Sequence, residues 1–259
     1  MSLLPAIAAS ARATSSKVTL EAFRPLACSR RRFSFRPPLQ SQAQQDVSSR
    51  IRHLMRESAQ PVALITTFLP SSRLIHGATL SSFSSISQRP DLVCFAMKTP
   101  SKLADALASH VAERGKDEET GEADMVINVL SESQAALADA YARPGTPPFE
   151  YALEGEGEGR LEGDLHPLEE AGLVSMDGEG LPVVQGSIGA LGCQVVDTIE
   201  LDRYSNKHEQ DKQGSKSKLY IARVINVHLP DTTSQTPLIY HRQKFVTTTT
   251  DLSTDTNTQ

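Results

Sequence analysis

The sequence predicts a single, mainly β domain, a β-barrel that carries a few helices. Six or seven segments have the apolar pattern of strands, whereas only two or three have the period of a helix. Most connections between these segments are short, which favours one sheet-based domain over two separate ones. The strand segments are residues 62–67, 74 onward, 92–97, 124–130, 188–199, 219–228 and 238–246.

Three helices are predicted among these strands. The first covers residues 47–57 and has one apolar face. The second begins with Thr99 as N-cap and Pro100 at the first helical position, and it runs to about Arg114. A Ser-x-x-Gln capping box opens the third, over residues 131–141. The apolar face of the first helix consists of Val47, Ile51, Leu54 and Met55.

The first 42 residues differ in composition from the rest. They hold seven basic residues and one acid, are rich in Ala and Ser, and contain no long apolar run. This composition is typical of an organellar transit peptide, and Arg31-Arg32-Phe33-Ser34 resembles a mitochondrial processing site. A basic arm that binds nucleic acid is the alternative. We interpret residues 1–42 as a transit peptide, which predicts a mitochondrial matrix protein.

Charge and cysteine content exclude several classes of function for the remainder. The whole chain carries −5 and residues 1–42 carry +6, which leaves −11 for the other residues. An acidic domain does not favour nucleic-acid backbones as partners. Cys94 and Cys193 lie in apolar strand patterns and form neither a disulfide framework nor a zinc motif. The histidines show no metal-ligand spacing, so no metal site is expected.

Two segments are expected to lie outside the packed core. Residues 143–180 are interpreted as an acidic, flexible insertion, because residues 150–180 hold ten acids and one base with Gly interleaved. Such a segment could meet a basic protein partner. Residues 248–259 form a polar tail that is expected to be disordered, which places the folded domain at residues 43–247.

A run of hydroxyl residues is the candidate ligand-binding stretch. Residues 79–87 read Thr-Leu-Ser-Ser-Phe-Ser-Ser-Ile-Ser, and their apolar members, Leu80, Phe83 and Ile86, recur every three residues. A regular strand alternates every two residues, so the backbone is expected to bend or bulge and to leave N–H and C=O groups for a ligand. A solvent-exposed strand face is the alternative.

The start of the second helix is a candidate phosphate site. Its first N–H groups have no partner within the helix, and the helix dipole is positive there. Ser101 could add a hydroxyl donor, and Lys102 could add a positive charge. An ordinary helix cap with an exposed lysine explains the same residues.

The order of these features resembles the flavin reductase-like family over about residues 50–246, excluding the insertion. The resemblance rests on residues 61–67, 77–87, 101–107, 127–138, 181–193 and 240–242. It implies an FMN-binding split β-barrel, a homodimer, and hydride transfer from NAD(P)H to flavin. The cofactor-binding residues it implies are Thr79, Leu80, Ser81, Ser82, Ser84, Ser101, Lys102 and His241.

One departure from the family pattern bears on activity. Members that use nicotinamides often carry Gly-Asp-His before the strand at residues 219–221, where this chain reads Ser215-Lys216-Ser217. His208 lies about nine residues earlier, in an enlarged loop. The resemblance therefore supports flavin binding more strongly than reductase activity. It leaves open a non-catalytic mitochondrial flavoprotein or assembly subunit with the same fold.

Overall fold

The computed structural model describes residues 39–115, 121–151, 165–175, 180–205, 216–230 and 235–248. Contacts divide the chain into two units, residues 1–46 and 47–259, and the sheets and helices α2 to α4 belong to the second unit. Residues 1–38 of the expected transit peptide and residues 249–259 of the expected tail lie outside the described residues. No helix in the described ranges is long and apolar enough to cross a membrane.

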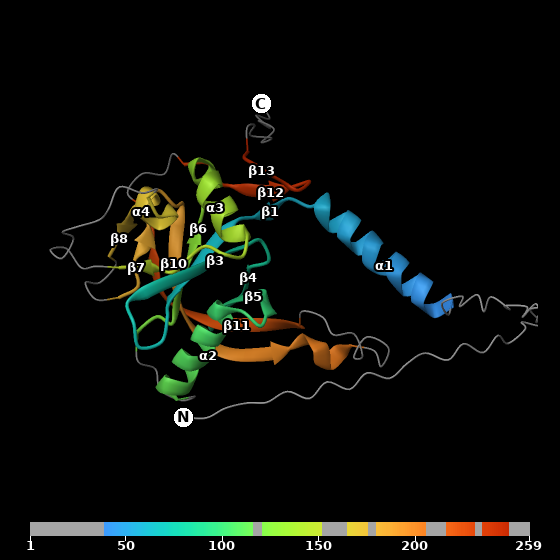
Figure 1. Cartoon of the computed structure of the whole chain (residues 1–259), viewed down its shortest axis with the longest axis horizontal. Helices are drawn as coiled ribbons and strands as arrows, with labels where there is room; N and C mark the ends of the chain where they lie inside the picture. Colours follow the sequence, from blue (N-terminus) through green and yellow to red (C-terminus); the bar gives the residue numbers. More distant parts are fainter. Residues whose placement is uncertain are drawn as a thin grey trace, which may run out of the picture. The chain divides into compact units, whose positions relative to one another are not determined.

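An eight-stranded antiparallel sheet forms the body of the domain (Figure 1). Its strands follow the order β4-β5-β11-β10-β6-β2-β3-β7. The predicted strands before residue 230 are confirmed, with small shifts at their ends. The bounds are β2 Ala63–Phe68, β3 Leu74–Leu80, β4 Ser84–Gln88, β5 Asp91–Thr99, β6 Met125–Val129, β7 Phe149–Glu150, β10 Gly189–Glu200 and β11 Lys216–His228.

Connectivity requires this sheet to curl. β3 and β4 stand six strand positions apart in the sheet, a separation of about 29 Å if the sheet were flat. Only residues 81–83 connect them, and the four steps from Leu80 to Ser84 span at most about 14 Å. The two sides of the sheet must therefore approach each other, which is the geometry of a barrel.

Helix α2, Lys102–Arg114, packs on the inner face of the curled sheet. Its buried residues Leu103 and Leu107 join a core with Phe95 of β5 and Tyr220 of β11, whose rings stack at 5.1 Å between centroids. Burial raises the pKa of Tyr220 to about 12. The opposite face of β2 and β3 is covered by α3, Ala135–Ala142, which follows the 3₁₀ turn η1, Glu132–Gln134.

A second, three-stranded sheet has the order β1-β12-β13. β1 is Gln60–Pro61, β12 is Ile239–His241 and β13 is Lys244–Val246. The single strand predicted at residues 238–246 is therefore wrong, because Arg242 and Gln243 both have positive φ and form a two-residue hairpin turn. Helix α1, Leu39–Arg56, precedes β1 and begins earlier than residue 47.

One local expectation about helix ends needs correction, and another is confirmed. The N-cap of α2 is Ser101, whose Oγ accepts the Ala104 N–H at 3.2 Å, and not Thr99. The capping box at Ser131 is confirmed, since the Ser131 N–H donates to Gln134 Oε1 at 3.0 Å.

The insertion expected at residues 143–180 is partly built into the fold. It contains β7, the short helix α4, Pro167–Ala171, and β8, Leu173–Val174, which pairs with β9, Val183–Val184. Leu168 is fully buried and joins the core beneath α3. Residues 152–164 and 176–179, which carry much of the acidic charge, lie outside the described residues.

Candidate functional site

The hydroxyl segment crosses from one side of the sheet to the other. β3 ends at Leu80, whose side chain is buried in the core together with the half-buried Phe83. β4 then pairs only with β5 and forms an edge of the sheet, with a register shift between Ser85 and Ser87. The expected bend and bulge are therefore confirmed, and one side of β4 keeps backbone groups that a ligand can reach.

The hydroxyl groups within this segment have different surroundings. Thr79 Oγ1 donates to the Ala138 carbonyl of α3 at 2.7 Å, so this hydroxyl serves the packing of the helix. Ser82 Oγ lies against Ala96 of β5, 3.3 Å from its carbonyl oxygen and 3.4 Å from its nitrogen. Ser84 is exposed, and its Oγ donates to the neighbouring Ser85 carbonyl at 3.2 Å. Ser81, between Leu80 and Ser82 in the chain, is half-buried.

The start of α2 provides groups suited to an anion. The first N–H bonded within the helix belongs to Asp105, which donates to the Ser101 carbonyl at 3.0 Å, so the N–H groups of Lys102 and Leu103 precede the internal ladder. Lys102 is exposed. Together these groups form a positive helix end beside a lysine, an arrangement that favours a phosphate group.

His76 shows that this helix end lies near β3. Burial lowers the pKa of His76, and the nearby positive charge of Lys102 lowers it further. His76 is half-buried, and its Nδ1 atom has no hydrogen-bond partner in the described ranges. Lys102 therefore approaches the strand that leads into the hydroxyl segment.

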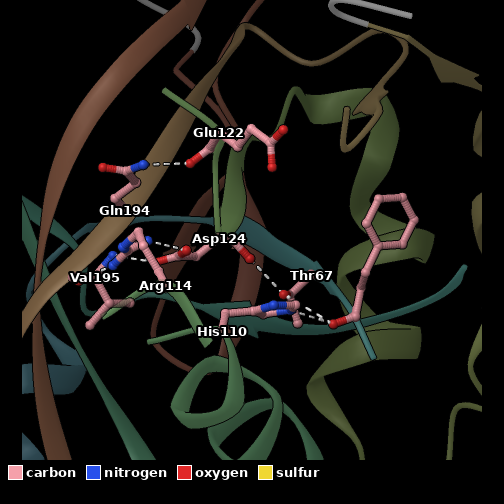
Figure 2. A network of polar contacts seen from close by, with 8 residues as sticks. Thr67, His110, Arg114, Glu122, Asp124, Gln194 and Val195 are labelled. Atoms are coloured by element: carbon pink, nitrogen blue, oxygen red, sulfur yellow. Dashed lines mark hydrogen bonds and ion pairs between the residues drawn. The ribbon is translucent and has the colours of Figure 1, made fainter. Parts of the chain in front are cut away.

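A buried polar network fixes the other end of α2 (Figure 2). Arg114 forms an ion pair with Asp124, and their side chains are only 10% and 8% exposed. The second guanidinium nitrogen donates to the Val195 carbonyl at 2.8 Å, and the Val195 N–H donates to Asp124 Oδ2 at 2.8 Å. A ring nitrogen of His110 lies 2.8 Å from the Phe68 carbonyl oxygen. These contacts tie α2 to β2, β6 and β10 and hold its N-terminus in place.

The segment that departs from the family pattern lies beside the start of α2. Lys216 of β11 pairs with Thr99, and Ser217 pairs with Lys98, whereas residue 215 lies outside the described residues. Lys216 Nζ is 3.0 Å from Asp202, and this contact raises the pKa of Lys216. A groove of about 390 Å³ separates α2 from this strand, and its walls include Asp105 and Lys218.

His241 does not join the other expected site residues within one chain. It belongs to β12 of the three-stranded sheet, where it pairs with Lys244 of β13. Figure 1 draws β12 and β13 at the opposite end of the domain from α2. Leu80 likewise points into the core, so only its backbone could contact a ligand.

The sequence did not predict the Arg114–Asp124 ion pair that anchors α2, nor the contact of Ser82 with the backbone of Ala96. Arg114 and Asp124 are ten residues apart, across a charged loop, and only the fold shows that they pair. In the described ranges, no group of three His, Cys, Asp or Glu side chains is arranged to hold a metal ion.

A model of the flavin reductase like domain matches residues 55–249. The chain belongs to this family. An NADPH-flavin oxidoreductase of Streptomyces viridifaciens is 26% identical over 180 residues, which are 68% of this chain and 70% of that protein.

Solved structures of flavin reductases share the fold. The NADH:FAD oxidoreductase of Streptomyces globisporus is 15% identical with a TM-score of 0.55, covering 80% of this chain and 96% of that one. The flavin reductase of the styrene monooxygenase from Pseudomonas putida is 20% identical with a TM-score of 0.52, covering 78% and 99%. At these identities the likeness establishes the fold, a mainly β flavin reductase split barrel.

Proposed function

We propose that this flavin reductase-like protein is an oxidoreductase that binds FMN and transfers hydride from NAD(P)H to the flavin. One observation carries the proposal: β5 joins the hydroxyl segment to the positive end of α2. Ser82 lies against Ala96, and Ser101 follows five residues later, at most about 17 Å along an extended strand. A ring, a ribityl chain and a phosphate in line can span this distance.

The residues present fit each part of a flavin nucleotide. The Lys102 and Leu103 N–H groups and the Lys102 ammonium would hold the phosphate. The edge backbone of β4 and the hydroxyls of Ser81, Ser82 and Ser84 would orient the ring and the ribityl chain. When bound, the flavin supplies the redox chemistry, accepting two electrons as hydride and passing them on. The side chains of this chain bind and orient, and none of them is required to move a proton.

Lys102→Glu is expected to weaken FMN binding at least tenfold and to leave riboflavin binding nearly unchanged. A hydrogen bond to a charged group contributes about 1.5–3 kcal/mol, and only FMN carries the phosphate. Lys244→Glu makes the same charge change on the exposed strand β13 and serves as the control. Fluorescence titration with both flavins measures the effect. Equal weakening of both ligands would place the phosphate elsewhere.

A second candidate function is a non-catalytic flavoprotein or assembly subunit. The observation that favours it is Ser217, which occupies the position where nicotinamide-using members often have His. Ser217 is half-buried beside Lys98, and serine is too short to reach a nicotinamide from the strand.

Steady-state oxidation of NADH and NADPH with added FMN separates the two functions. If the protein is a reductase whose activity this serine limits, Ser217→His should raise the rate about tenfold, which corresponds to an activation free energy lower by about 1.4 kcal/mol. Ser217→Ala should not raise the rate. If flavin binds and neither the natural protein nor Ser217→His oxidises a nicotinamide, the non-catalytic function is supported.

We further propose a homodimer in the mitochondrial matrix, with the acidic residues 143–180 able to meet a basic protein partner. The composition of residues 1–42 supports the location, and the family resemblance supports the dimer. N-terminal sequencing of the protein from isolated mitochondria tests the location. A mature terminus between residues 34 and 42 is expected, and an intact Met1 would contradict it.

A further inference from the structure

The hydroxyl of Tyr220 is buried without a hydrogen-bond partner among the residues that the structure describes. Tyr220 is 2% exposed, and its ring stacks on that of Phe95 in the core. Burial raises the pKa of this hydroxyl, and the nearby charges of Glu200 and Asp105 raise it further. The group therefore stays protonated, as a hydrogen-bond donor close to two carboxylates that do not accept from it. A buried donor of this kind is destabilising until an acceptor meets it.

The same two carboxylates line the groove of about 390 Å³ between α2 and β11. Lys216 and Lys218 form its strand wall, and because alternate residues of a strand share a face, Tyr220 is next in the same row. The exposed fraction falls along this row, from 65% for Lys216 through 22% for Lys218 to 2% for Tyr220. A ligand in the groove therefore meets a positive charge at the open end and a hydroxyl donor at the inner end.

The opposite wall of the groove is built from small residues of α2 and of the segment just before it. Pro100, Ala104 and Ala108 follow one another at intervals of four residues and line this wall. They place no long side chain across it, so a planar ring can lie between the helix and the aliphatic stems of the two lysines. Asp105, which is exposed in the first turn of α2, adds a carboxylate at the rim. The groove is thus a slot for a flat ring, with a donor at its inner end and an acceptor at its rim.

We propose that this groove binds the adenosine phosphate part of a nucleotide. Adenine presents an exocyclic amine beside a ring nitrogen, which places a donor and an acceptor on one edge. The ring nitrogen accepts from the Tyr220 hydroxyl, the amine donates to Asp105, and the phosphate reaches Lys216 at the open end. Lys216 pairs with Asp202 at 3.0 Å on the surface, where such contacts contribute little, so its ammonium is available to a phosphate.

This site is separate from the proposed flavin contacts. Among the described residues that line the groove, none is assigned above to the flavin. The adenosine phosphate has two sources, a free adenine nucleotide or the adenosine half of FAD or NADPH. The second source rests on the proposed function, whereas the binding of AMP alone does not.

Calorimetric titration of the full chain with AMP tests the proposal. Ala108→Phe places a ring in the groove from an exposed position and should lower the affinity for AMP at least tenfold. Ala112→Phe makes the same change one turn further along α2, at an exposed residue outside the groove lining, and should leave the affinity unchanged. Circular dichroism verifies that both variants fold.

Three single changes test the individual contacts. Tyr220→Phe removes only the hydroxyl and keeps the ring against Phe95. It should weaken AMP binding about tenfold without lowering the free energy of unfolding, a combination that a purely structural hydroxyl would not give. Lys216→Glu should weaken the binding of AMP but not that of adenosine. Replacing AMP by IMP, which carries a carbonyl in place of the amine, should lower the affinity about tenfold as well.

Ala108→Phe also identifies the source of the adenosine. Weaker binding of FAD with FMN binding unchanged assigns it to FAD, and a raised KM for NADPH with kcat unchanged assigns it to NADPH. A loss confined to AMP assigns the groove to a free nucleotide. A natural protein that does not bind AMP, or AMP binding that Ala108→Phe and Tyr220→Phe both leave unchanged, overturns the proposal. A protein that binds AMP in this groove but lacks reductase activity contradicts the proposed function alone.

Discussion

Asp124→Ala is expected to lower the free energy of unfolding by about 3–5 kcal/mol, the cost of breaking a buried ion pair. Asp124 accepts from Arg114 and from the Val195 N–H, and both charged side chains are at most 10% exposed. The substitution leaves the Arg114 guanidinium buried without its carboxylate. It also releases the end of α2 from β10, so flavin binding at the site proposed for the N-terminus of the helix should weaken as well.

Chemical denaturation measures this loss, and Asp139→Ala is the matched control. Asp139 pairs with Arg143 at 2.7 Å on the surface of α3, where the two side chains are 51% and 74% exposed. Exposed pairs of this spacing contribute about 0.3–0.5 kcal/mol. Similar small losses for both variants would mean that water or a rearranged side chain compensates Arg114, and that the network does not anchor the helix.

Local patterns predicted the long strands before residue 230 and the break in the hydroxyl segment. Leu80 and Phe83 are three residues apart and both point toward the core, which a regular strand cannot accomplish. The three-residue period therefore required the chain to leave the sheet, and it does so at residues 81–83. Ile86 continues the period in sequence but is 49% exposed, because β4 has by then become an edge strand.

Tertiary contacts decided what local patterns could not. Thr79 lies in the hydroxyl-rich run and was expected to face a ligand. However, α3 packs on that face of β3, and the Thr79 hydroxyl donates to the Ala138 carbonyl of the helix. The pairing of Arg114 with Asp124 depends on where α2 ends relative to β6. Thr99 and Ser101 are both acceptable N-caps by composition, and the actual start of the helix selects Ser101.

Leu168 is the residue that most clearly separates the described part of the insertion from a flexible loop. Its side chain is fully buried in the core beneath α3. His166 caps α4 by accepting the Leu168 N–H on Nδ1 at 3.2 Å, and its Nε2 donates to the Pro147 carbonyl at 3.0 Å. The ring of His166 also lies 4.9 Å from that of Phe149. High acidity and many glycines hid this anchoring side chain from sequence reasoning.

Leu168→Ala is therefore expected to destabilise the domain by about 2–5 kcal/mol, the usual cost of truncating a buried leucine. Leu165→Ala removes the same atoms three residues earlier, where the side chain is 60% exposed, and should change stability by less than about 0.5 kcal/mol. Urea denaturation of the two variants compares them directly. If both are neutral, residues 165–175 dock too weakly to stabilise the domain, and the whole insertion behaves as the flexible loop that its composition suggests. A large loss for Leu168 alone would show that the barrel depends on an anchor placed inside an otherwise acidic loop.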